Sequence, residues 1–294
     1  DTLDIIVVVN NFGIDTIKNL TIQGKINKDT LTRVKITRKL ASGDTAHVKI
    51  GSYIFKTDSI YNIYSWSTLP NGVNDPKKSN DTLKLLNIRP AMSGVYTIGG
   101  TSPNFATFKA AINALKLAGV ADSVRFRVRQ GTYTEQLIIP AISGAGGRNS
   151  IVFESQDKDT TKVLLRFAST KSDTNFVVQL KGANGITFRY LKIMSFSSSN
   201  YNVVFDIRGK AANNTLYRNY IEGSNTTYGS TSNALIFSGQ DADDNFVIAD
   251  NIIKKLKDAF INDGKICGKT IEKITQGITH IGKYGPRFQS VGSL

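Results

Sequence analysis

The stretch from about Phe176 to Tyr284 repeats a short pattern, and this repeat limits the folds open to the chain. A first apolar strand ends in glycine, a turn follows, and a second apolar strand follows the turn. The first strand recurs as NVVFDIRG, NALIFSG, DAFINDG and HIGKYG, and the second as GITFRYLKI, NTLYRNYI, NFVIADNII and KTIEKITQGI. Aligned on Ile186, Leu216, Val247 and Ile271, the second strand returns after 30, 31 and 24 residues. Such a period indicates a solenoid, in which each unit buries its apolar face on its neighbour.

The pattern inside one period indicates strands. Ile186 and Phe188 alternate with Thr187 and Arg189, and the segments are rich in β-branched and aromatic residues between Gly, Asn and Ser clusters. No window of the repeat has the spacing of an amphipathic helix. The sequence therefore predicts a parallel β-helix.

Asparagines recur at matching places in successive repeats, namely Asn214, Asn219, Asn245 and Asn251. Ligand binding is one interpretation. Turn formation and stacking of asparagines between coils is the other, and it is the one we favour.

Composition and charge narrow the classes of partner. The single cysteine, Cys267, excludes an internal disulfide framework and a multi-cysteine metal site. The net charge of +14 favours anionic partners, among them acidic polysaccharide, lipopolysaccharide, nucleic acid and acidic proteins. Aromatic residues are not interleaved as in proteins that bind single-stranded nucleic acid, so no specific nucleic-acid partner is expected.

Nothing in the sequence predicts a membrane-spanning segment. No apolar run approaches the roughly 20 residues that a transmembrane helix needs. The sequence begins within a segment that has the pattern of a β-strand, and no signal peptide precedes it in the given sequence. We therefore expect a mature or excised piece of a longer extracellular or cell-surface protein.

Residues 1–90 are predicted to form a separate all-β domain. Strand-like segments follow one another at intervals of about 10–15 residues, as LDIIVVVNNFG, LTIQGKI, RVKITRKL, AHVKIGSYIF and YNIYSWSTL. This spacing predicts a sandwich of about seven strands. Together with the LASGDT turn and the loop PNGVNDPKKSNDTL, the segments resemble the bacterial immunoglobulin-like modules of the cell-adhesion-related (CARDB) type. The resemblance implies an immunoglobulin-like fold.

An amphipathic helix is predicted at about 104–118, where it would cap the open end of the solenoid. Its apolar face would consist of Phe105, Phe108, Ile112, Leu115 and Leu117, and Gly119 would end it. The order TFKAAINAL, SVRFRVRQ, GTYTEQLIIP resembles the start of pectinesterase-like and pectate-lyase-like right-handed β-helix proteins. It is most similar to the versions in large secreted or surface proteins of Bacteroidetes. The resemblance, from about Gly94 to Asn262, implies a right-handed parallel β-helix over residues 91–294.

The resemblance does not extend to catalytic residues. Gly131, Tyr133 and Glu135 match only the opening GxYxE element of the pectinesterases, which is structural in that family, and no LGRPW-like segment exists. Esterase activity is therefore not expected.

Two acidic clusters could bind Ca²⁺ through oxygen ligands. A polysaccharide lyase would place Ca²⁺ on Asp241, Asp243 and Asp244, with a base among Lys254, Lys255 and Lys257. The loop with Asp75 and Asp81 is the second candidate. Turns use the same residue types, and we favour that interpretation for both clusters.

Arg125, Arg127 and Arg129 are the candidate ligand-binding residues. They alternate with Val124, Phe126 and Val128, so the apolar side chains would point into the solenoid and the arginines outward, about 7 Å apart. Arginine pairs bidentately with carboxylate or sulfate. A solvated strand face that blocks edge pairing is the alternative. Further cations, Arg189, Lys192, Arg208 and Arg218, could extend the patch.

Asp followed by Ser or Thr and a mostly apolar residue occurs eight times, at Thr2, Thr16, Thr30, Thr45, Ser59, Thr82, Ser123 and Thr160. The tripeptide resembles the O-glycosylation sequon of Bacteroidetes envelope and secreted proteins, which implies a glycoprotein. Turn formation by Asp-Thr is the alternative.

Taken together, the sequence predicts a mostly β protein, an immunoglobulin-like sandwich followed by a right-handed parallel β-helix. The expected function is adhesion, through binding of polysaccharide or a cell-surface glycan, with other envelope proteins as further candidate partners. No cofactor is expected, Ca²⁺ being the alternative. A lyase or other carbohydrate-active enzyme and a purely structural stalk remain open.

Overall fold

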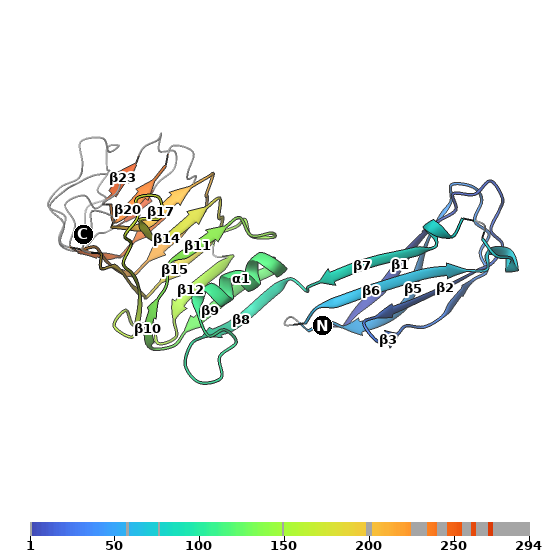
Figure 1. Cartoon of the computed structure of the whole chain (residues 1–294), viewed down its shortest axis with the longest axis horizontal. Helices are drawn as coiled ribbons and strands as arrows, with labels where there is room; N and C mark the ends of the chain where they lie inside the picture. The colour runs from blue at the N-terminus through green and yellow to red at the C-terminus, as the bar shows by residue number, and fades with distance from the viewer. Residues whose placement is uncertain are drawn as a thin grey trace. The chain divides into compact units, whose positions relative to one another are not determined.

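A computed structural model describes residues 2–56, 59–75, 77–148, 150–197, 202–224, 234–239, 246–254, 260–262 and 270–272. The chain divides into two compact units, residues 1–90 and 91–294, both built mainly of β-strands (Figure 1). No helix in these ranges is long and apolar enough to cross a membrane.

Unit 1 contains two antiparallel sheets. One pairs β1 (Thr2–Asn10) with β5 (Thr45–Ile54). The other has the order β3-β2-β6-β7, with β4 also paired to β2. Its strands are β2 (Leu20–Ile26), β3 (Asp29–Thr30), β4 (Val34–Ile36), β6 (Tyr61–Thr68) and β7 (Thr82–Ile88), and 3-10 turns cover Pro70–Gly72 and Lys78–Asn80. Both sheets contribute to one core, formed by Leu20, Ile22, Ile36, Leu40, Ala46, Val48 and Ile50.

Unit 2 is a parallel β-solenoid with three sheets, seen as stacked arrows in Figure 1. The first solenoid sheet contains β8 (Met92–Ile98), β9 (Val120–Val128), β12 (Ile151–Ser155), β15 (Ile186–Arg189), β18 (Thr215–Tyr217), β21 (Val247–Ala249) and β24 (Thr270–Glu272). The second contains β10 (Gly131–Thr134), β13 (Val163–Phe167), β16 (Lys192–Ser195), β19 (Tyr220–Glu222) and β22 (Ile252–Lys254). The third contains β11 (Leu137–Pro140), β14 (Phe176–Lys181), β17 (Val203–Arg208), β20 (Ile236–Ser238) and β23 (Phe260–Asn262).

Each coil therefore has three strands, where the sequence repeat suggested two. The segment GITFRYLKI forms β15 and β16, separated by a bend at Tyr190, whose φ is 57°. Arg218 and Asp250 adopt the same left-handed conformation at the matching bends of the next coils. The predicted parallel β-helix is confirmed.

The pairing register corrects the sequence alignment. Leu216 pairs with Phe188 on one side and Ile248 on the other, where the sequence suggested Ile186 and Val247. The first offset is two residues, so Ile186 stays on the inner face and is buried, but the second is one residue, which moves a side chain to the opposite face of its strand. Accordingly, Ile248 is buried whereas Val247 is partly exposed. Ile271 pairs with Ile248, so the step from Val247 to Ile271 is also one residue out of register, whereas Ile271 does line up with Leu216.

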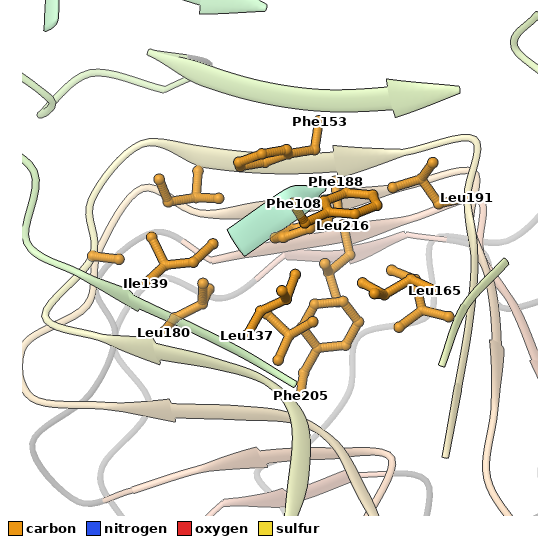
Figure 2. Close-up of a cluster of buried hydrophobic side chains, with 14 of the residues drawn as sticks. Phe108, Leu137, Ile139, Phe153, Leu165, Leu180, Phe188, Leu191, Phe205 and Leu216 are labelled. Carbon is orange, nitrogen blue, oxygen red and sulfur yellow. The ribbon is translucent and has the colours of Figure 1, made fainter. Parts of the chain in front are cut away.

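Stacked aromatic rings run along the core of the solenoid. The Phe126 and Phe153 rings stack at 4.8 Å between centroids, and those of Phe153 and Phe188 at 5.1 Å. Figure 2 shows Phe153, Phe188 and Phe205 packed around aliphatic side chains from all three sheets, among them Leu216, Leu165 and Leu180. Equivalent positions in successive coils carry similar side chains, so the core continues from coil to coil.

Helix α1 (Phe108–Ala118) lies at the β8 end of the solenoid and packs Phe108, Ala111, Ile112 and Leu115 onto its core. The predicted end is confirmed, since Gly119 has a φ of 68°. The predicted start is wrong: the Thr107 side chain caps the helix, and Phe105 instead forms a bridge with Ile98. Leu117 is 64% exposed, because it lies two residues beyond Leu115 and so points to the opposite side of the helix.

Candidate functional site

Strand β9 presents the predicted arginine row as alternation requires. Val124, Phe126 and Val128 are fully buried, whereas Arg125 and Arg127 are exposed. The two guanidinium groups therefore project from the outer face of the first solenoid sheet.

Arg129 departs from that prediction. It lies just beyond the end of β9, and its Nη1 donates to the backbone oxygens of Gly99 and Thr101. A side chain on Gly100 would collide with it, at 2.7 Å from the Arg129 Cδ. Arg129 thus holds the loop after β8 and is not the third member of an outward row.

A buried carboxylate that the sequence analysis missed lies beside the row. Glu154 on β12 pairs in register with Arg127 on β9 and Arg189 on β15, and it is only 3% exposed. The Arg189 Nε donates to Glu154 Oε2 at 2.6 Å, and the Arg125 Nε lies 3.7 Å from Oε1. The alternation of Ile151 and Phe153 with Glu154 indicates an outward carboxylate, but only the register shows which cations it meets.

We call Arg125, Arg127, Arg189 and Glu154 the arginine cluster. Three positive charges against one negative charge leave this cluster at +2. Within the described ranges, the Arg127 side chain forms no ion pair or hydrogen bond, and the Arg125 side chain is 45% exposed. The cluster therefore offers guanidinium donors to a ligand.

The other cations do not extend this patch. Lys192 Nζ lies 2.8 Å from Glu222 Oε2 on the second sheet, and Arg218 Nε lies 3.3 Å from Asp250 Oδ2 at a bend. Arg208 belongs to the third sheet, where its Nε lies 2.8 Å from Asp206 Oδ1. Each is paired with an acid, so none adds net charge to the arginine cluster.

A second buried carboxylate, Asp206, lies on the outward side of the third sheet and is 2% exposed. It accepts a hydrogen bond from Gln179 Nε2 at 2.7 Å and from Arg208 Nε at 2.8 Å. Both of its oxygens are thus engaged. Glycoside hydrolysis uses a pair of carboxyl groups, and the described outward residues of this sheet include no second one.

The asparagines form a structural ladder, as favoured from the sequence. Asn219 Nδ2 donates to the Phe188 oxygen at 2.8 Å and to Asn251 Oδ1 at 3.1 Å. Asn219 Oδ1 accepts from the Leu191 amide, and Asn214 bonds Ala183 and Ile186 in the same manner. Asn214, Asn219 and Asn251 are at most 1% exposed, so they do not face a ligand. Asn245 lies outside the described residues.

The candidate Ca²⁺ ligands Asp241, Asp243 and Asp244 also lie outside the described residues, as do Lys255 and Lys257. In the other cluster, Asp75 accepts from the Lys77 amide at 2.7 Å. Burial, followed by the negative charge of Asp75, raises the pKa of the Asp81 carboxyl. The described residues contain no group of three or more His, Cys, Asp or Glu that could hold a metal.

The glycosylation candidates lie at the surface. Thr2, Thr16, Thr30, Thr45, Thr82 and Ser123 are exposed, and Ser59 and Thr160 are partly exposed. All eight hydroxyl-bearing residues can thus be approached from solvent to some degree.

No protein-family model and no curated protein matches this chain. Similar solved structures include the pectin methylesterase of Aspergillus niger, with 18% identity, a TM-score of 0.45, and coverage of 64% of this chain and 58% of that one. The pectin methylesterase of carrot has 16% identity and a TM-score of 0.42, covering 63% of this chain and 64% of that one. This chain thus spans less than two thirds of either enzyme. A likeness of this strength assigns neither activity nor residue roles.

Proposed function

We propose that unit 2 binds an acidic polysaccharide through the arginine cluster and does not cleave it. The observation that carries this proposal is that the Arg127 side chain is exposed and unpaired beside a buried carboxylate, Glu154, which Arg125 and Arg189 also approach. Guanidinium groups recognise carboxylate and sulfate through bidentate hydrogen bonds.

The strands hold these groups in place. Neighbouring strands lie about 4.8 Å apart, and alternate residues of one strand about 7 Å apart. Arg189 is fixed by its short bond to Glu154, so it loses little side-chain freedom when a ligand binds. Glu154 therefore serves to orient the cluster, at the cost of one of its three positive charges.

Adhesion is the role we propose for the whole chain, as part of a secreted or surface protein of the Bacteroidetes type. Unit 1 would be an immunoglobulin-like spacer, and glycans on its exposed sequons would keep it extended and soluble. Several weak contacts between one polymer and a rigid solenoid would add up to useful affinity. Other envelope proteins are further candidate partners of the spacer.

The experiment is to mix the purified chain with polygalacturonate, heparin and neutral dextran, with and without Ca²⁺. Affinity electrophoresis reports binding, while absorbance at 235 nm and reducing ends report cleavage. We expect binding to the two polyanions alone, weakening as salt rises. Cleavage abolished by Asp241→Ala or Asp243→Ala would make the protein a lyase. Absence of both binding and cleavage would contradict the proposal and leave a purely structural role, that of a stalk.

A further inference from the structure

Unit 1 contains an open groove of about 780 Å³ beside β1. Residues 7–10 of β1 and the following Asn11 form one wall, and Ser65 and Leu83, from β6 and β7, form another. The 3-10 turn at Pro70–Gly72 and the loop that follows it line one end. The groove lies wholly within this unit.

The groove borders a strand edge with free backbone groups. Among the described strands, β1 pairs with β5 alone and β7 with β6 alone. The Asn11 amide donates to Asp44 and the Asn11 oxygen accepts from Gly43, so both groups of Asn11 point toward β5. Because backbone groups alternate in direction along a strand, those of Val8 and Asn10 point to the free edge. This edge can accept another strand.

Leucine side chains of β7 lie uncovered on the inner side of their sheet. Leu83 on β7 pairs with Ser65 on β6, which pairs in turn with Gly24 on β2. In the same way, Leu85 pairs with Ile63, and Ile63 with Ile26. Since cross-strand partners share a face, both leucines belong to the side that carries the buried Ile26. They are nevertheless 50% and 43% exposed. A strand added to β1 would shield them from water.

One end of the groove is acidic in a chain whose net charge is +14. Its charged lining residues are Asp15, Asp75, Asp81 and Lys77, which sum to −2. The raised pKa of Asp81, caused by burial and then by Asp75, indicates that a cation there would be stabilising.

We propose that this groove binds an extended peptide strand with alternating apolar residues and a Lys or Arg at one end. Its backbone would pair with the free edge of β1, its apolar side chains would cover Leu83 and Leu85, and its cation would meet the acidic end. Main-chain hydrogen bonds would supply affinity and the alternate side chains specificity, as in other cases of strand addition.

The test is the fluorescence anisotropy of labelled peptides added to the full chain. The probe is KTVTVTVTN, and the comparisons are KTVPVTPTN, which cannot form a regular strand, and ETVTVTVTN, which reverses the terminal charge. We expect the proline peptide to bind at least about tenfold more weakly, because it loses strand hydrogen bonds. The glutamate peptide should bind several-fold more weakly. Equal binding of all three peptides would overturn the proposal.

Matched variants of the protein locate the site. Val8→Pro removes a free-edge amide that β5 does not use, and Val8→Thr keeps that amide. Leu83→Glu places a charge on the proposed contact. Leu86→Glu places the same charge on the opposite face of β7, where Leu86 is 52% exposed. We expect only Val8→Pro and Leu83→Glu to lose KTVTVTVTN binding. If Val8→Pro does not fold, as judged by Trp66 fluorescence, the leucine pair decides. Equal effects of Leu83→Glu and Leu86→Glu would exclude the groove.

Discussion

The Glu135 carboxylate accepts a hydrogen bond from the Phe108 backbone amide at 3.1 Å, and another from Lys109 at 2.9 Å. Glu135 follows β10 and is 8% exposed, so a buried negative charge meets the N-terminus of α1. Tyr133, two residues earlier, directs its hydroxyl to the backbone oxygens of Arg129, at 2.9 Å, and of Ile98, at 3.3 Å, where the loop before the helix begins. The GxYxE element therefore ties the capping helix and the loop before it to the first coil, which is the structural role expected from the sequence.

Replacement of Glu135 should loosen this cap. Glu135→Ala leaves two helix N-terminal amides without partners, and we expect it to cost about 2–4 kcal/mol of unfolding free energy. Glu135→Gln keeps the shape and one acceptor, so its cost should be smaller. Urea unfolding followed by far-UV circular dichroism measures both. A Glu135→Ala protein as stable as the parent would contradict the capping role.

The asparagine ladder makes a second prediction. Asn219→Ala strands the Leu191 amide and the Phe188 oxygen in the interior, and we expect a loss of about 2–4 kcal/mol. Asn113→Ala on the exposed side of α1 is the matched control and should be neutral or slightly stabilising, because alanine favours helix. Thermal unfolding of both variants makes the comparison. Equal melting temperatures would show that the ladder contributes nothing.

The unfolding free energy of unit 1 should fall at acid pH, and Asp4 should be one cause. Hydrogen bonds from Lys49 and then Ser52, the first at 2.8 Å, lower the pKa of Asp4 below its ordinary value of 3.8. The stabilisation is thus fully present above that value and is lost as the pH falls through the lowered folded-state pKa. Asp4→Asn should lose less stability than the parent over this acid range. Fluorescence of Trp66, the single tryptophan, follows unfolding of unit 1 alone.

Exposure should decide where glycans attach. In protein secreted by a Bacteroidetes host, we expect glycan at Thr2, Thr16, Thr30, Thr45, Thr82 and Ser123, with lower occupancy at the partly exposed Ser59 and Thr160. Peptide mapping by mass spectrometry measures the occupancy of each site. Glycan confined to Ser59 and Thr160, or absent throughout, would contradict the sequon prediction.

The repeat was sufficient to predict the solenoid, because alternation and glycine-bounded strands are local properties. The strand Leu20–Ile26 was predicted with its observed limits. The bend at Tyr190 was missed, since only its positive φ separates β15 from β16. Strand β7 was also missed, because its apolar residues follow a loop rich in turn formers.

The candidate site was predicted only in part, for a related reason. Alternation along one strand places Arg125 and Arg127 outward, but it says nothing about the neighbouring strands. Glu154 meets Arg127 and Arg189 only through the register of three parallel strands. The pairing of Asp206 with Gln179 likewise joins residues 27 positions apart, which no local pattern reveals.

The role of the arginine cluster in binding polysaccharide is tested most directly by comparing two double variants that lose the same charge. Arg125→Ala/Arg127→Ala removes two cations from the arginine cluster, and Lys109→Ala/Lys116→Ala removes two from exposed positions of α1. The measurement is the affinity of each for polygalacturonate across a range of salt concentrations. We expect the arginine variant to bind at least about tenfold more weakly and the lysine variant to change about twofold or less. Equal losses would mean that general positive charge, and not the arginine cluster, binds the polymer.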